Sequence, residues 1–185
     1  MEADEEIYVR YIENDDDDDL EALLSHNREG LLLFLIGFTH NEQDAEDLLI
    51  DTFTKIAVDK PAFIPVRQGS FKKWLYTIAR RNALMWLRKK RIHLEMLDED
   101  IQDTSELPDV NLLKEERNRT LYLAMEAIKA DYQRVLYLLY FEGLSHDEIA
   151  SVMGMSKHKI YNLVKRGKEA LRNKLEGMGI HDAGY

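Results

Sequence analysis

The segment from Gly143 to Leu175, GLSHDEIASVMGMSKHKIYNLVKRGKEALRNKL, has the pattern of two helices joined by a tight turn. Ser145, followed three residues later by Glu148, is typical of a capping box that begins the first helix. Gly154 stands where the chain must turn with positive φ, which costs glycine little. Ser156 can cap the second helix. The spacing predicts a helix-turn-helix, whose second helix enters the major groove of DNA.

The second helix is expected to have an apolar and a basic face. In the first helix the inner face is Ile149, Ala150 and Met153, with Ala150 small enough for close helix approach. The core face of the second is Ile160, Leu163, Val164 and Leu171. Its other face carries Lys157, Tyr161, Lys165 and Lys168, with His158 and Asn162 beside them. Residues 156–176 hold seven Lys or Arg and two Glu, a net charge of +5. An ordinary helical hairpin with a solvated lysine face is the alternative, but the whole chain carries −10.

Composition limits the classes of protein to consider. The chain has 185 residues, 45% of them hydrophobic, which is enough for one domain or two small ones. It contains no cysteine, so disulfide frameworks and thiolate metal sites are excluded. No signal peptide is visible, and the longest apolar run, Leu31 to Phe38, is too short to span a bilayer. We therefore expect a buried helix there and a cytoplasmic location without membrane insertion.

Charge alternates in blocks along the chain. Residues 1–60 carry eighteen acids and four bases, whereas residues 61–94 carry nine bases and no acid. Residues 95–116 return to nine acids and one base. Two basic blocks far apart in sequence predict two DNA contacts, with the acidic parts facing another partner.

The amino-terminal part predicts several helices. Ile7, Tyr8, Tyr11 and Ile12 fit one short amphipathic helix. The carboxylates of residues 15–19 predict a solvated segment or a helix entry, with a metal cluster as the weaker alternative. Separate helices are expected at about 20–28 and 30–40. A further helix opens at residues 41–42, with the apolar stripe Ala45, Leu48, Leu49, Thr52, Phe53 and Ile56 and with an acidic face that is either solvated or a docking surface for a basic partner.

A long basic helix is predicted from Ser70, which we expect to cap it, to about residue 92. Its predicted core residues are Phe71, Trp74, Leu75, Ile78, Leu84 and Leu87. Aromatic residues among bases can stack on nucleotides, but for Trp74 we favour packing, and for Trp86 both alternatives stay open. The acidic residues 93–112 contain Pro108 and no apolar period, which predicts a linker. Helices at about 110–129 and 131–142 would then brace the helix-turn-helix.

Three strings in this order resemble the extracytoplasmic-function class of bacterial RNA polymerase sigma factors. DAEDLLIDTF at 44–53 resembles its core-polymerase-binding helix, and GSFKKWLYTIARRNA at 69–83 its promoter-melting and minus-ten-reading segment. YQRVLYLLYFEGLSHDEIASVMGMS at 132–156 resembles its minus-thirty-five-reading domain. The resemblance implies an all-α fold of two small helical domains joined by a flexible acidic linker. The expected boundaries are 1–92 for region 2, 93–112 for the linker, 113–178 for region 4 and 179–185 for a tail.

The resemblance also implies roles for individual residues. Those expected to bind core polymerase are Asp44, Asp47, Leu48, Asp51 and Lys55. Those expected to bind minus-ten DNA are Phe63, Arg67, Ser70, Lys73, Arg80, Arg81, Asn82 and Arg88. Those expected to bind minus-thirty-five DNA are Ser156, Lys157, His158, Lys159, Tyr161, Asn162, Lys165, Arg166 and Lys168. No catalytic residue, metal or cofactor is implied, so the chain is not expected to be an enzyme.

The implied partners are core RNA polymerase, through the coiled coil of its largest subunit and its flap, promoter DNA and an anti-sigma factor. The protein is expected to be a monomer when free and nucleoid-associated when bound to polymerase. Ile50 departs from the family's usual Gln, and Tyr161 and Leu163 from its usual Lys and Arg. Two other functions remain open: a dimeric helix-turn-helix regulator that does not engage polymerase as a sigma subunit, and a non-DNA adaptor whose acidic blocks mimic nucleic acid.

Overall fold

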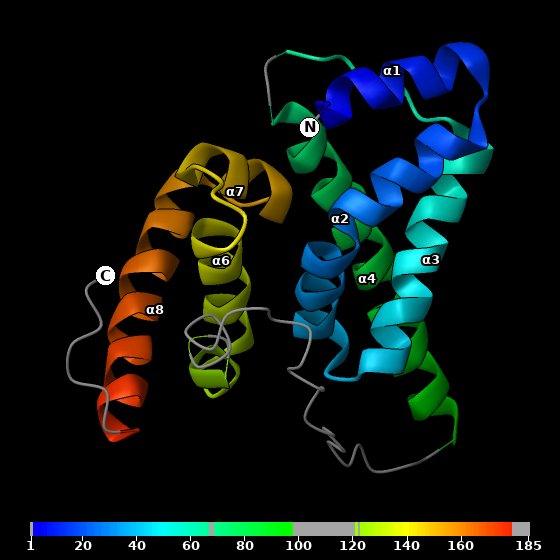
Figure 1. The fold of residues 1–185 in the computed structure, drawn as a ribbon. Coiled ribbons are helices and arrows are strands. Elements are labelled where there is room, and N and C mark those ends of the chain that lie inside the picture. Colours follow the sequence, from blue (N-terminus) through cyan, green and yellow to red (C-terminus); the bar gives the residue numbers. More distant parts are fainter. Residues whose placement is uncertain (1, 67–68, 98–120, 122, 179–185) are drawn as a thin grey trace. The chain divides into compact units, whose positions relative to one another are not determined.

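The computed structural model describes residues 2–66, 69–97, 121 and 123–178, and within these ranges it contains helices and no strand (Figure 1). The helices are α1 (Asp4–Asn14), α2 (Asp17–Thr39), α3 (Glu42–Asp59), α4 (Ser70–Leu97), α6 (Ala130–Tyr140), α7 (His146–Met153) and α8 (Lys157–Gly177). The expected all-α class is confirmed. The chain divides into two compact units, residues 1–107 and 108–185. In the part that the structure describes, no helix is long and apolar enough to cross a membrane.

Helix α2 is the centre of the first unit and packs against α1, α3 and α4. Residues 31–39 are all buried, as expected for the apolar run. The expected break between helices at 20–28 and 30–40 is wrong, because α2 runs unbroken through Gly30. A glycine inside a helix costs only about 1 kcal/mol relative to alanine, and burial of the flanking apolar residues outweighs that cost.

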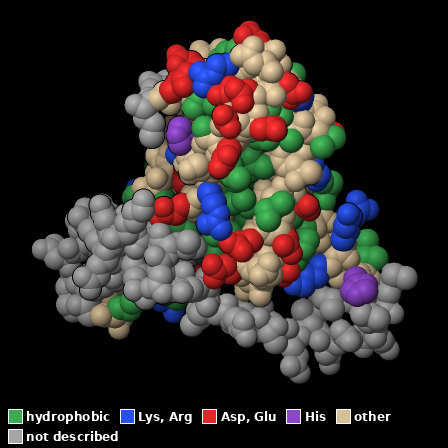
Figure 2. All heavy atoms as spheres, turned by 45° about the vertical axis from the view of Figure 1, so that its right-hand side comes forward, with side chains coloured by type: hydrophobic (Ala, Val, Ile, Leu, Met, Phe, Trp, Pro, Cys, Tyr) green, Lys and Arg blue, Asp and Glu red, His purple; other side chains and the backbone are tan. Residues whose placement is uncertain are grey.

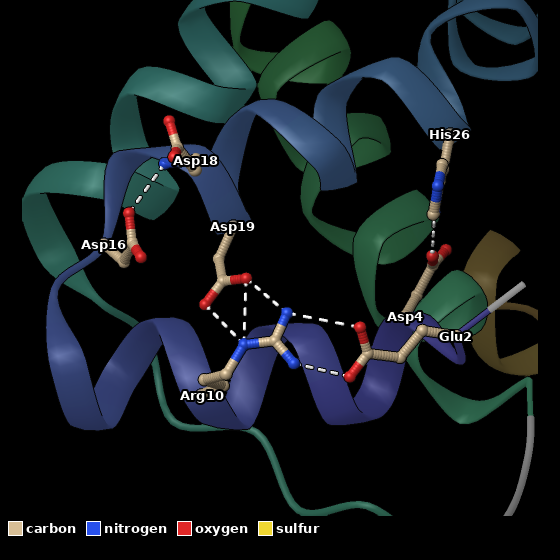
Figure 3. A network of polar contacts seen from close by, with 7 residues as sticks. All are labelled: Glu2, Asp4, Arg10, Asp16, Asp18, Asp19 and His26. Atoms are coloured by element: carbon tan, nitrogen blue, oxygen red, sulfur yellow. Dashed lines mark hydrogen bonds and ion pairs between the residues drawn. The ribbon is translucent and has the colours of Figure 1, made fainter.

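The acidic run at residues 15–19 begins α2 and attaches it to α1 (Figure 3). The Asp16 side chain accepts a hydrogen bond from the backbone N–H of Asp18 at 3.0 Å. Asp19 is buried and accepts from Arg10 Nε at 2.9 Å, and this guanidinium lowers the pKa of the Asp19 carboxyl. Arg10 also pairs with Glu2. The run is therefore a helix entry whose innermost carboxylate fastens α1 to α2.

Helix α3 buries its whole predicted stripe of Ala45, Leu48, Leu49, Thr52, Phe53 and Ile56. The Asn41 side chain caps its first turn by accepting from the N–H of Asp44 at 2.8 Å. At the other end Lys60 has positive φ (41°) and Pro61 follows, so the helix stops where the sequence indicates.

Helix α4 differs from expectation at its start and along its inner face. Ser70 does not cap it, because its hydroxyl makes no hydrogen bond with the described residues; the Glu5 carboxylate accepts from the Phe71 N–H at 2.9 Å instead. Leu84 is 41% exposed, so its predicted core role is wrong. The buried positions of α4 are Phe71, Leu75, Tyr76, Ala79, Asn82 and Ala83, while Trp74, Ile78 and Leu87 are half-buried. Among these, Ala79 and Ala83 are small, which suits close packing of α2 and α3 on α4.

The second unit contains the predicted helix-turn-helix in α7 and α8. Ser145 and Glu148 form the full capping box, and Gly154 has φ 57°. Ser156 caps α8 by accepting from the Lys159 N–H at 3.3 Å. The expected helix at 131–142 is α6, whose residues 135–138 are buried. Residues 121 and 123–126 of the helix expected at about 110–129 are helical, and the rest of its first half lies outside the described residues.

Helix α8 approaches α6 closely at Gly167. A Cβ atom built there would lie 3.2 Å from Cδ1 of Leu136 and 3.3 Å from Cβ of Tyr132, both on α6. Ala150, which we expected to allow the close approach, is only half-buried, whereas Ile149, Val152 and Met153 are buried. The predicted inner face of α7 is therefore confirmed for Ile149 and Met153, and it also includes Val152, which was not predicted.

Candidate functional site

The basic face of α8 is a continuous exposed surface. Lys157, His158, Lys159, Tyr161, Lys165, Arg166 and Lys168 are exposed, and Asn162 is half-buried beside them. On the opposite side Ile160, Val164 and Leu171 are at most 4% exposed. Leu163 is half-buried, between the two faces. The predicted register of this helix is confirmed by Ile160 and Val164.

Several side chains of this face already have polar or aromatic partners. Lys157 pairs with Asp147 at 2.7 Å, and Asn162 lies 3.0 Å from His158 through Nδ2 and Nε2. Lys168 lies over the Tyr140 ring at 5.5 Å. Exposed pairs of this kind contribute little to stability, so each can be exchanged for a contact with phosphate or base at small cost.

The basic residues of α4 form a second such surface. Arg81 and Arg88 are exposed, and Lys73, Arg80 and Ser70 are half-buried. Arg67, which we expected among the DNA contacts, lies outside the described residues. Trp86 lies beneath Lys90, whose Nζ is 4.5 Å from its ring centroid.

Asn82 differs from its basic neighbours on α4 because it is only 5% exposed. Its Oδ1 accepts from Lys55 Nζ at 2.7 Å, and its Nδ2 donates to Thr52 Oγ1 at 3.0 Å. Thr52 in turn donates to the Leu48 carbonyl at 2.7 Å. Asn82 therefore joins α4 to α3, and Lys55 is engaged by the same contact.

Helix α3 carries an acidic outer face. Asp47 and Asp51 are exposed, and Ile50 between them is 60% exposed. Asp44 is half-buried and pairs with Lys90 at 3.3 Å, while Leu48 is 3% exposed and belongs to the core. Figure 2 brings the right-hand side of Figure 1 forward and shows hydrophobic side chains bordered by acidic ones on this face of the first unit. The surface therefore offers both charge and apolar area.

The loop of residues 61–66 joins α3 to α4 beside an aromatic cluster. Phe63 lies 5.8 Å from Tyr8, 5.7 Å from Phe71 and 5.4 Å from Trp74, measured between ring centroids. The preference for packing at Trp74 is thereby confirmed. The sequence pattern places Tyr8 on an amphipathic helix but does not predict its contact with this loop, or that of Glu5 with α4, because both contacts span more than fifty residues.

Two segments of the chain match family models. Residues 23–92 match Sigma-70 region 2, and residues 118–171 match Sigma-70, region 4. The chain is 30% identical over 162 residues to RNA polymerase sigma factor YlaC of Bacillus subtilis (strain 168), which covers 85% of this chain and 92% of that protein. It is 26% identical over 163 residues to ECF RNA polymerase sigma factor SigX of the same strain, which covers 84% and 83% respectively.

Solved structures share the fold. The sigma factor RpoE, in complex with the anti-sigma factor NepR from Bartonella quintana, matches with a TM-score of 0.67 and 24% identity, over 85% of this chain and 97% of that chain. CnrH, in complex with the cytosolic domain of CnrY, matches with a TM-score of 0.63 and 18% identity, over 95% of this chain and 99% of that chain.

Proposed function

This chain belongs to the extracytoplasmic-function class of sigma-70 factors, and we propose that it binds core RNA polymerase and directs initiation at specific promoters. The observation that carries the proposal is the presence of region 2 and region 4 in one chain, each with an exposed basic helix face, on α4 and on α8. A regulator that acts without polymerase would use α8 but would leave the surfaces of α3 and α4 without a role.

Polymerase binding is assigned to the outer face of α3. Asp47 and Asp51 have no hydrogen-bond or ion-pair partner among the described residues, so their charges are available to a basic partner. Ile50 adds exposed apolar area between them. A charged rim around an apolar centre is the usual composition of a protein interface.

Promoter opening is assigned to the loop 61–66 and to α4. Capture of a base from the nontemplate strand costs a few kcal/mol of unstacking, which pocket contacts must repay. Ile64 and Val66 are 78% and 80% exposed, so they can contact an unstacked base. Arg81 and Arg88 are exposed on α4, which supports a role for them in binding backbone phosphates.

Recognition of the minus-thirty-five element is assigned to the exposed face of α8. Lys165 is suited to a phosphate, which adds affinity without sequence preference. Asn162 can form a bidentate pair with adenine once it leaves His158. Because the RpoE structure contains an anti-sigma factor, we extend the proposal to an anti-sigma partner for this chain.

The test is a direct binding measurement with core polymerase. Asp47→Lys combined with Asp51→Lys should weaken binding by at least about tenfold, because each reversal places like charges across the interface. The thermal midpoint should stay near that of the parent, since both residues are exposed.

The matched control is Glu13→Lys with Glu21→Lys, which makes the same charge change at exposed positions of α1 and α2. If both double variants weakened polymerase binding equally, the effect would be one of net charge, and the assignment of polymerase binding to α3 would be contradicted. Absence of binding by the parent protein would contradict the proposed function itself.

A further inference from the structure

Helix α1 has a buried face that the proposed function does not use. Glu5, Tyr8 and Tyr11 follow one another at intervals of three residues, which places them on one side of the helix. They are 8%, 1% and 2% exposed. The helix also precedes the region 2 match, which begins at residue 23.

This face contacts the beginning of the connection from α3 to α4 and the first turn of α4; Figure 1 shows the described part of the connection passing close to α1. At the near end Lys60 pairs with Asp15, the C-cap residue of α1, and lies over the Tyr11 ring at 5.5 Å. At the next residue the Tyr8 hydroxyl donates to the Pro61 carbonyl at 2.8 Å. At the far end Glu5 accepts from the first turn of α4. One helix thus fixes both ends of the connection.

Tyr8 is the principal anchor of the loop 61–66. Among the described residues, its hydroxyl makes the only hydrogen bond to this loop. Its ring also packs edge-on against Phe63, at an interplanar angle of 77°. Both contacts come from a side chain that is itself fixed by Phe71 and Trp74, at 5.4 Å and 4.9 Å. The outer side chains of the loop, Ile64 and Val66, are left exposed.

We propose that α1 holds the loop 61–66 in the conformation that binds the nontemplate DNA strand, and that Tyr8 is a positioning residue for minus-ten recognition. The inference rests on the proposed function, which assigns base capture to this loop. Ordering a loop at the moment of binding lowers affinity, so a loop that is already held binds a base with less loss. Tyr8 thereby affects selectivity without touching DNA.

The test compares Tyr8→Phe with Tyr11→Phe. Each change removes one hydroxyl from a buried ring of the same helix. The Tyr8 hydroxyl bonds to the loop, whereas the Tyr11 hydroxyl lies 3.5 Å from the Ala57 carbonyl in α3. Retained rings keep the aromatic packing, so both variants should fold.

The first measurement uses the free protein. Because the chain has no cysteine, Ala62→Cys gives a unique site for a spin label. Ala62 is exposed and lies between Pro61 and Phe63, the two loop residues that Tyr8 contacts. Tyr8→Phe should shorten the rotational correlation time of the label, and Tyr11→Phe should leave it unchanged. Equal changes in both variants, or no change in Tyr8→Phe, would overturn the proposal that α1 holds the loop through Tyr8.

The second measurement uses the full chain bound to core polymerase. The probe is a single-stranded oligonucleotide with the nontemplate minus-ten sequence of a promoter that the parent transcribes, compared with a base-substituted oligonucleotide. Tyr8→Phe should reduce the affinity ratio between the two by about fivefold, as expected for one hydrogen bond. Tyr11→Phe should keep the ratio, and neither variant should alter binding to core polymerase.

An unchanged ratio in Tyr8→Phe would overturn its role in recognition even if the label moved faster. A parent protein that fails to bind core polymerase would instead refute the proposed function. In that event the label measurement still decides whether α1 holds the loop, so the two failures are distinguishable.

Discussion

Asn82 offers a sharp separation between a structural and a DNA-binding role. Asn82→Ala removes a side chain that is 5% exposed and that accepts from Lys55 at 2.7 Å and donates to Thr52 at 3.0 Å. We expect the variant to lose stability in the free protein. Its neighbour Arg81 is exposed, and Arg81→Ala should instead weaken promoter binding with little effect on stability.

The magnitude follows from the two bonds. A neutral hydrogen bond contributes about 1 kcal/mol net, and one to a charged group about 1.5–3 kcal/mol. Lys55 is half-buried, so water can replace part of its lost contact, and Thr52 keeps its bond to the Leu48 carbonyl. The sum is about 2 kcal/mol, or about 10 °C in the thermal midpoint of a unit of this size.

Urea unfolding followed by tryptophan fluorescence is a suitable assay, because the two tryptophans, Trp74 and Trp86, both lie in the first unit. Binding of the holoenzyme to promoter DNA is measured in parallel under conditions where both variants remain folded. The reasoning is refuted if Asn82→Ala unfolds at the parent's urea concentration yet loses promoter affinity as Arg81→Ala does.

Three further results are expected. Gly167→Ala should lower the free energy of unfolding by about 1 kcal/mol, because crowding against α6 exceeds the gain in helix propensity. Gly177→Ala, which has open space at its Cβ, should raise the free energy of unfolding slightly. Urea unfolding followed by circular dichroism measures both, and stabilisation by both variants would contradict the close packing assigned to Gly167. Burial raises the pKa of Tyr8 to about 12, above its unfolded value of about 10, so its contribution is complete below about pH 10 and is lost as the pH rises towards 12. Thermal midpoints across this range should fall less in Tyr8→Phe than in the parent, and parallel curves would contradict the assignment. Lys165→Ala should reduce the salt slope of minus-thirty-five binding by about one, whereas Asn162→Ala should relax preference at one base pair by about 1–3 kcal/mol; the opposite pattern in salt titrations on substituted promoters would exchange their roles.

Local signals predicted the second unit well. The Ser145–Glu148 capping box and the turn at Gly154 depend on residues only a few positions apart, and the structure contains both. The apolar stripe of α3 was predicted equally well, because its apolar residues recur at helical spacing and all face one core. In such segments the sequence pattern and the fold depend on the same local geometry.

Long-range contacts account for what the sequence did not reveal. The cap of α4 comes from Glu5, sixty-six residues away from Phe71, so local sequence favours Ser70 instead. Asn82 stands in a basic run, although its spacing from Leu75 and Ala79 already places it on the buried face. Leu84 is hydrophobic but exposed, because the buried face of α4 passes through the neighbouring Ala83.

Transcription by purified core polymerase tests the central claim most directly. Core enzyme supplied with this protein should produce run-off transcripts of defined length from a set of templates that share minus-ten and minus-thirty-five sequences. The transcripts should disappear with Asp47→Lys combined with Asp51→Lys and persist with Glu13→Lys combined with Glu21→Lys. The account would be contradicted if the protein alone bound specific DNA sequences as a dimer and core enzyme supplied with it produced no transcript from any template.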